Sequence, residues 1–171
     1  MDTSARLAAH VEAVNKTNGA AVVLGEVARA AAQEFAGKKV RTAAGQPTAK
    51  FAAALLGAIA AADAATLNGS GSPFGRTADG VQFWLETSTA SVWLNFKGCQ
   101  TADGIASYHD TGVYLGAITD GGIFQHDGRT VEPTRRHNWT VAEVTEARRR
   151  AREAQEAARE AVAACGPFAD R

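Results

Sequence analysis

Cysteine is scarce in this chain of 171 residues, which contains only Cys99 and Cys165. Two cysteines are too few for a disulfide-rich scaffold, and their spacing matches no zinc-binding motif. We therefore expect a reduced, cytoplasmic compartment, and we expect neither a bound metal nor a cofactor.

Long hydrophobic runs are also missing. The longest apolar run without a charge, from Phe51 to Ala62, is too short and too rich in alanine to span a bilayer. The first residues lack the basic and apolar regions of a signal peptide. We expect a soluble protein without membrane contact, and its alanine and arginine usage is typical of a GC-rich bacterial genome.

The chain has no excess of either charge, because 18 lysines and arginines balance 18 aspartates and glutamates. No global field therefore attracts nucleic acid, and any such binding needs a local patch. The Gly-x-Ser-x-Gly, His-Glu-x-x-His and Cys-x-x-Cys motifs are absent as well. No reaction class is indicated, and we expect a protein that is not an enzyme.

Apolar residues at helical spacing dominate residues 1–67. A first helix is predicted to end at Asn18-Gly19, and a second to run from Ala20 to Ala36, where Gly37 closes it. A third helix is predicted from Thr48 to about Leu67. This third helix is apolar on nearly every side, so we expect it to be the buried centre of the core.

After residue 67 the hydrophobic pattern changes from helical spacing to the alternation typical of strands. Residues 68–80 are rich in glycine and serine and predict a flexible connector. Residues 81–132 alternate apolar and polar side chains between Asp-Gly turns, which predicts an antiparallel meander of about five or six strands. The expected fold is α+β, a single domain over residues 1–171 in which helices cover one face of the sheet.

Three hairpins have a predictable register. Their expected loops are Thr87 to Ala90, Asp110-Thr111-Gly112 and Asp127-Gly128. The apolar partners agree at every second position of the first hairpin, which supports its alignment. The predicted cross-strand neighbours are Leu85 and Val92, Phe83 and Leu94, Val81 and Phe96, Trp84 and Trp93, Tyr108 and Tyr114, Phe124 and Val131, and His126 and Arg129.

Residues 139–166 predict a long C-terminal helix. Thr140 and Glu143 form a capping box, and Gly166 with Pro167 ends the helix. A narrow seam of small residues recurs along it at alternating spacings of three and four: Val144, Ala147, Ala151, Ala154, Ala158 and Ala161. Another helix can approach this seam closely, either from a second copy in a homodimer or from the N-terminal part of the same chain.

Aromatic residues indicate the leading function. The expected alternation places Trp84, Trp93, Tyr108 and Tyr114 on the sheet face that also carries Gln82, Glu86, Asn95 and Lys97. Exposed aromatics among polar side chains are typical of a protein-binding surface, whereas a covering helix would make them core residues. The leading hypothesis is an adaptor, regulator or inhibitor that binds a protein partner through this face or the C-terminal helix.

Basic residues indicate an alternative function, a regulator that binds nucleic acid. The candidate contacts are Arg135, Arg136, Arg148, Arg149 and Arg152. Glutamates alternate with the arginines of the C-terminal helix, and Glu146 has the favoured spacing for pairing with Arg150. A solvated helix surface with internal ion pairs is the preferred interpretation of this region.

A third hypothesis is a hydrolase. The three hairpin loops are expected to share one rim of the sheet, which would gather Glu86, His109, Asp110, His126 and Asp127. Asp110-Thr111-Gly112 also resembles the catalytic triplet of aspartic proteases over these three residues, a family that needs a second triplet or a symmetric dimer. The structural alternative is that the aspartates form turns and the histidines end strands.

Overall fold

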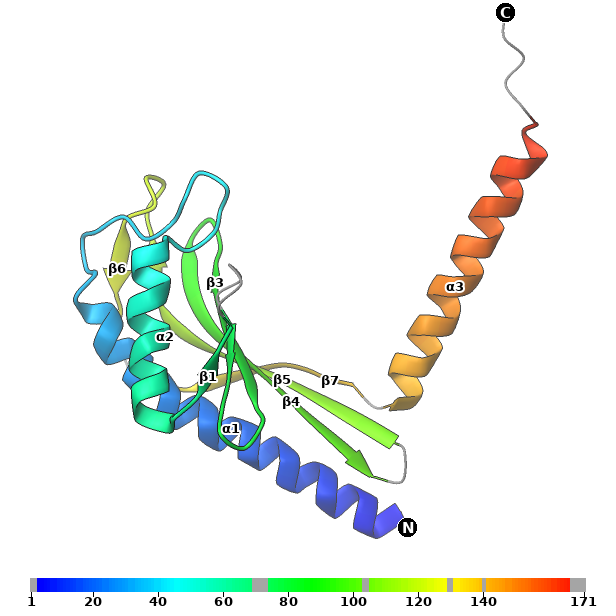
Figure 1. Ribbon diagram of the computed structural model, residues 1–171, viewed down its shortest axis with the longest axis horizontal. Helices are drawn as coiled ribbons and strands as arrows, with labels where there is room; N and C mark the ends of the chain where they lie inside the picture. Colours follow the sequence, from blue (N-terminus) through cyan, green and yellow to red (C-terminus); the bar gives the residue numbers. More distant parts are fainter. Residues whose placement is uncertain (1–2, 69–73, 103–104, 129–130, 140, 167–171) are drawn as a thin grey trace, which may run out of the picture. The chain divides into compact units, whose positions relative to one another are not determined.

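The computed structural model describes residues 3–68, 74–102, 105–128, 131–139 and 141–166. The chain divides into two compact units, residues 1–138 and residues 139–171. The predicted α+β class is confirmed: the helices α1 (Thr3–Gln33) and α2 (Ala49–Asp63) precede a seven-stranded sheet, and the helix α3 (Val141–Ala164) follows it (Figure 1). That the two units form one domain stays a prediction.

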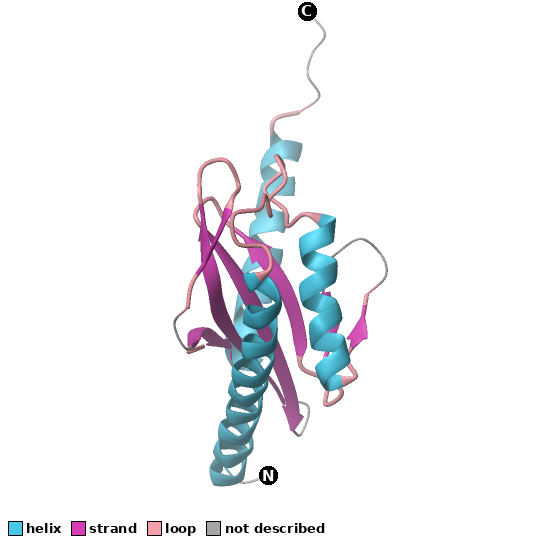
Figure 2. Cartoon of the chain, turned by 90° about the vertical axis from the view of Figure 1, so that its left-hand side faces the viewer, coloured by secondary structure: helices cyan, strands magenta, loops and turns pink. Residues whose placement is uncertain are grey.

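Six strands lie side by side in chain order, as expected for a meander. They are β1 (Thr66–Leu67), β2 (Phe74–Arg76), β3 (Gln82–Thr87), β4 (Ser91–Ala102), β5 (Ile105–Ile118) and β6 (Phe124–His126). The last strand, β7 (Pro133–Trp139), pairs with β5. Figure 2 shows α1 and α2 on the same face of this sheet, so the prediction that helices cover one face is confirmed.

The hydrophobic core lies between these two helices and the inner face of the sheet. Phe51 of α2 is fully buried, and its ring lies 5.0 Å from the ring of Phe35 and 5.7 Å from that of Phe124. Other fully buried side chains in this core are Leu55, Ile59, Phe83, Val92, Leu94, Phe96, Val113 and Leu115. Burial of this apolar surface is the main stabilising contribution to unit 1–138.

The prediction of two helices before residue 37 is wrong, because α1 is continuous through Asn18-Gly19. A glycine inside a helix costs only about 1 kcal/mol relative to alanine. The face that packs on the sheet continues across it, with Thr17 buried before Gly19 and Ala21 and Leu24 buried after it. Packing on β4 and β5 therefore outweighs the local stop signal.

The predicted third helix is too long and less buried than expected. It ends at Asp63, because Ala64 adopts a left-handed conformation with φ 51°. Thr66–Leu67 then forms β1, and the expected connector contains β2. The solvent side of α2 is lined by alanines, which count as apolar in the pattern but bury little area when packed.

The first hairpin keeps its predicted faces but has another register. Leu85 pairs with Leu94 and Phe83 with Phe96, a shift of two residues from the predicted pairs. The Ser88 N–H donates to the Ser91 carbonyl at 2.9 Å, so the chain reverses over two residues instead of four. A shift of two leaves every side chain on its own face, which is why the apolar pattern alone admits both registers.

The expected turn at Asp110-Thr111-Gly112 is wrong, because these residues lie in the middle of β5. Asp110 pairs with Lys97 and Gly112 pairs with Asn95 in a ladder that runs without a break from Trp93↔Tyr114 to Ala102↔Ile105. Tyr108 and Tyr114 are therefore not partners. Pairing with β4 overrides the local turn preference of Asp and Gly.

The last predicted hairpin is also wrong. Phe124 pairs with Ile118 and His126 with Gly116, both in β5, and Val131 belongs to no strand. The chain leaves β6 after His126 and returns as β7, which pairs with β5. Arg129, the predicted partner of His126, lies outside the described residues.

The C-terminal helix is confirmed as α3, Val141–Ala164. Glu143 lies in its first turn, where a carboxylate favours the helix dipole. Gly166 follows with φ +69°, the left-handed conformation that ends helices. Thr140 and Pro167 lie outside the described residues.

Candidate protein-binding face

The sheet has an outer face opposite α1 and α2, built by β2, β3, β4 and β5. Strand alternation places every second side chain there, starting from Gln82 in β3 and Trp93 in β4. The outer face includes Phe74, Gln82, Trp84, Glu86, Trp93, Asn95, Lys97, Cys99, Tyr108, Asp110, Gly112 and Tyr114. The predicted grouping of four aromatics with four polar residues is therefore present.

The two tryptophans are not opposite each other, contrary to the predicted register. Trp84 lies between Phe74 and Asn95, whereas Trp93 lies between Glu86 and Tyr114. The rings of Trp93 and Tyr114 meet edge to face, with centroids 5.4 Å apart, and the Trp93 indole N–H donates to the Ser91 hydroxyl at 2.9 Å. These contacts hold the Trp93 ring in one orientation.

Polar side chains fill the space between the aromatics. Asn95 is only 2% exposed, and its amide nitrogen donates to the Glu86 carboxylate at 2.7 Å. The Lys97 ammonium lies 5.3 Å from the centre of the Tyr108 ring, a cation–π distance. The outer face is therefore an ordered surface in which all four aromatic residues are half-buried and none is fully buried.

A hollow of about 450 Å³ lies beside Trp84. Its walls come from β2, β3, β4 and the loop before α2: Gly45, Gln46, Phe74, Gln82, Glu86 and Lys97. The Thr87 hydroxyl donates to the Gly45 carbonyl at 2.6 Å and holds this loop against β3. The hollow combines an apolar floor with one cationic and one anionic side chain.

The expected rim of histidines and carboxylates is not assembled. His109 is 2% exposed on the inner face, where its ring lies 4.7 Å from that of His10 in α1. Asp110 faces outward, and His126 belongs to β6. The Asp127 carbonyl accepts a hydrogen bond from the buried Arg29 at 3.1 Å. Within the described part of the chain, no three His, Cys, Asp or Glu side chains are grouped to hold a metal ion.

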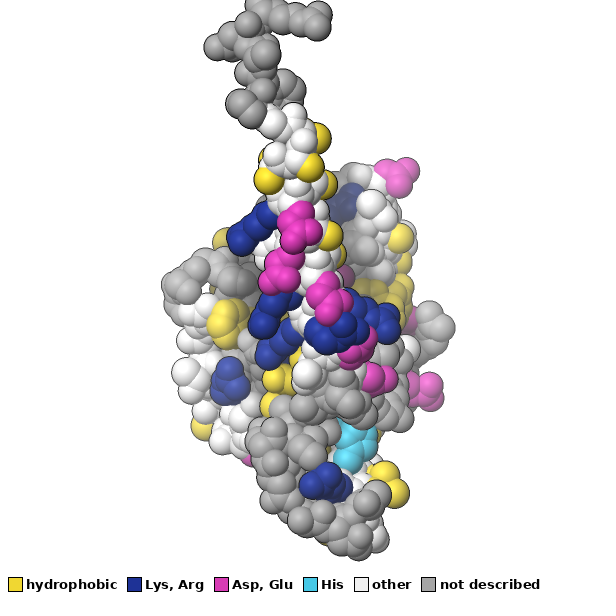
Figure 3. All heavy atoms as spheres, turned by 90° about the vertical axis from the view of Figure 1, so that its right-hand side faces the viewer, with side chains coloured by type: hydrophobic (Ala, Val, Ile, Leu, Met, Phe, Trp, Pro, Cys, Tyr) yellow, Lys and Arg dark blue, Asp and Glu magenta, His cyan; other side chains and the backbone are white. Residues whose placement is uncertain are grey.

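The basic candidates belong to different units. Arg135 and Arg136 lie in β7 of unit 1–138, and the remaining three lie in α3. Figure 3 shows arginines and glutamates alternating along α3. Arg149 forms ion pairs with Glu146 and Glu153, and Arg150 pairs with Glu146 at 2.8 Å. Hydrogen bonds from Arg149 and Arg150 lower the pKa of Glu146, so much of this charge is neutralised within the helix.

The alanine seam of α3 is exposed within its own unit. Ala147, Ala151, Ala154, Ala158 and Ala161 are all solvent-accessible, and Val144 is half-buried. Their use as a helix interface stays a prediction.

Two residues, Phe74 and Lys16, contribute to surface sites to which the sequence alone did not assign them. Phe74 of the outer face lies in the segment predicted as a connector, and Gly-rich neighbours hide the short strand β2. Lys16 donates to the Asp79 carbonyl at 3.0 Å, although 63 residues separate them. No local pattern signals such a long-range contact.

Comparison of the chain with protein-family models, with curated proteins and with solved structures found no significant match. Among the described residues, no helix combines the length and the apolar character that crossing a bilayer requires.

Proposed function

We propose that this protein is a non-enzymatic interaction protein, an adaptor, regulator or inhibitor, that binds a protein partner through the outer face of its sheet. One observation carries the proposal: Trp84, Trp93, Tyr108 and Tyr114 are half-buried among polar side chains on the face opposite α1 and α2. Large aromatics of this kind supply most of the binding energy at protein interfaces. A cytoplasmic bacterial setting is part of the proposal.

Pre-ordering of the aromatic rings supports binding. Tyr114 and Ser91 fix the Trp93 ring, so little side-chain entropy is lost when a partner covers it. The neighbouring Glu86 and Asn95 are already hydrogen-bonded to each other, which lowers the cost of covering them.

The experiment begins with affinity capture from a lysate of the native host and identification of the captured protein by mass spectrometry. Calorimetry then compares the purified partner's affinity for the wild-type chain and for Trp93→Ala. We expect a loss of more than about 1 kcal/mol, or at least fivefold in Kd. The control is Val23→Ala, which truncates an exposed side chain of α1.

Full-strength binding by a folded Trp93→Ala protein would remove the outer face as the interface. Capture of nucleic acid alone, with an affinity that falls steeply with salt, would favour the alternative of a nucleic-acid-binding regulator.

A further inference from the structure

The C-terminal end of β4, after Lys97, is paired with a neighbouring strand on one side only. On the β3 side, the ladder begins at Gln82 opposite Lys97. On the β5 side, pairing continues to Ala102 opposite Ile105. Among the described residues, no strand pairs with the β3 side of β4 beyond Lys97.

The direction of the free backbone groups follows from the hairpin. The hydrogen bond from Ser88 to Ser91 marks a hydrogen-bonded pair, and such pairs recur at every second residue of an antiparallel ladder. The N–H and C=O groups of Cys99 and Thr101 therefore point to the open side. Neither residue has a backbone partner there in the described part of the chain, and Cys99 is exposed.

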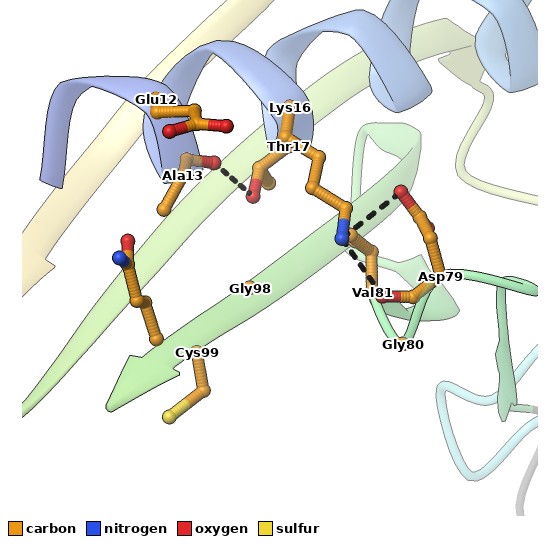
Figure 4. Close-up of a pocket in the computed structure, with 10 residues that line it drawn as sticks. Glu12, Ala13, Lys16, Thr17, Asp79, Gly80, Val81, Gly98 and Cys99 are labelled. Atoms are coloured by element: carbon orange, nitrogen blue, oxygen red, sulfur yellow. Dashed lines mark hydrogen bonds and ion pairs between the residues drawn. The ribbon is translucent and has the colours of Figure 1, made fainter. Parts of the chain in front are cut away.

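The turn that precedes β3 is held by hydrogen bonds and an ion pair, and β3 begins only after it, at Gln82. Gly80 has φ +94°, and the Thr77 N–H donates to the Val81 carbonyl at 2.8 Å. The Asp79 carboxylate accepts a hydrogen bond from the Thr77 hydroxyl. It also lies 3.2 Å from the Lys16 ammonium, a contact shown in Figure 4. The Thr77 hydrogen bond, with support from Lys16, lowers the pKa of Asp79 and keeps it ionised.

A hollow of about 260 Å³ lies beside this edge, between α1 and β4. Figure 4 shows Glu12, Lys16 and Thr17 of α1 above Gly98 and Cys99 of β4. Two acceptor groups of this hollow, on Glu12 and Gln100, are available to a cation. Lys16 is already bound to Asp79, whereas the Glu12 carboxylate has no ion pair among the described residues. The Gln100 side-chain oxygen is buried without a hydrogen-bond partner.

We infer that an extended segment of a protein partner adds to the open edge of β4 as an antiparallel strand and places a lysine or arginine side chain in the hollow beside Glu12 and Gln100. Backbone hydrogen bonds to Cys99 and Thr101 provide the affinity, and the hollow selects the basic residue. Cys99 is the cross-strand neighbour of Tyr108, but the inference does not depend on the outer-face aromatics binding a partner.

The probe is a fluorescein-labelled peptide of four Thr-Arg repeats, with four Thr-Glu repeats as the matched control. In the bound register, arginines face the hollow opposite Gly98 and Gln100, so the threonine N–H groups point at β4. N-methylation of the threonines is therefore expected to abolish binding, whereas N-methylation of the arginines preserves it. Glu12→Gln is expected to weaken binding severalfold.

Cys99→Pro tests the edge in the protein itself. It deletes one outward N–H and leaves the ladder to β5 complete, because Cys99 bonds only toward the open side. We expect binding about fivefold weaker than with the control Cys99→Val, and protection from amide exchange at Cys99 and Thr101 of the wild-type chain. Equal binding by both variants would overturn the inference, as would peptide-induced shifts at Trp84 and Trp93 instead of at Cys99. The methylated peptides decide the question if Cys99→Pro fails to fold.

Discussion

Glycines set how closely α1 packs on the sheet. Gly98 of β4 lies beneath Thr17, and a Cβ atom there would overlap the Thr17 hydroxyl oxygen. Gly25 of α1 likewise faces Val131 and Val113, with a Cβ position 2.8 Å from the nearest Val131 methyl group. The absence of a side chain at these two glycines allows α1 and the sheet to pack closely.

We predict that Gly98→Ala lowers the free energy of unfolding by about 1–3 kcal/mol, because the added methyl group overpacks the contact with Thr17. Gly19→Ala is the control. No heavy atom lies within 4 Å of its Cβ position, so the better helix former should stabilise the protein by about 0.5–1 kcal/mol. Urea unfolding measures both changes. Failure of an added Thr17→Ala to restore stability would contradict the overpacking explanation.

At the scale of the elements, α3 carries ion pairs between neighbouring turns. Three ion pairs join Arg149 and Arg150 to Glu146 and Glu153 within one stretch of the helix. Exposed pairs of this kind each contribute little to stability. The alanine seam on the same helix has no apolar partner among the described residues of unit 139–171.

We predict that the seam mediates a homodimer. Ala154→Arg places a charge at the middle of the seam and should convert the dimer into a folded monomer. Ala163→Arg, on the face of α3 opposite the seam, is the matched control and should stay dimeric. Light scattering measures the mass of each variant. A wild-type chain that is already monomeric at high concentration contradicts the prediction.

At the scale of the whole molecule, all buried core side chains among the described residues belong to unit 1–138. Its buried side chains run from Ala21 to Val131, and none of them belongs to α3. Within this unit, α1 packs on β4 and β5, which are distant from it in sequence. Stability of the fold is therefore expected to depend on residues 1–138.

Truncation after Thr140 tests this expectation. The shortened chain retains β7 and all core residues, so its Tm should lie within a few degrees of the full-length value. Circular dichroism measures the thermal transition, with loss of helical signal matching removal of α3. A truncated chain that is unfolded at room temperature would show that α3 is required for folding.

Local patterns were sufficient for part of the fold. The long helix α3 with Gly166 in a left-handed conformation after it, and the alternation that places Trp84 and Trp93 on the outer face, are present in the structure, and Gly37 has φ +75° in the turn after α1. Each depends on residues a few positions apart. The turn expected at Asp110 and the break expected at Gly19 were equally local signals, and pairing with distant segments overrode both.

The sequence by itself determined the α+β class, the order of helices, sheet and helix, and which side chains share a sheet face, because periodicity is written in neighbouring residues. Only the tertiary structure decided the register of β3 and β4, the full length of β5, and the open edge at Cys99. A register shift of two preserves every face, and the edge at Cys99 is open because β3 begins only at Gln82, after the turn that Lys16 contacts through Asp79. Contacts between residues distant in sequence determine the register and the open edge, and a short stretch of the sequence does not include both partners of such a contact.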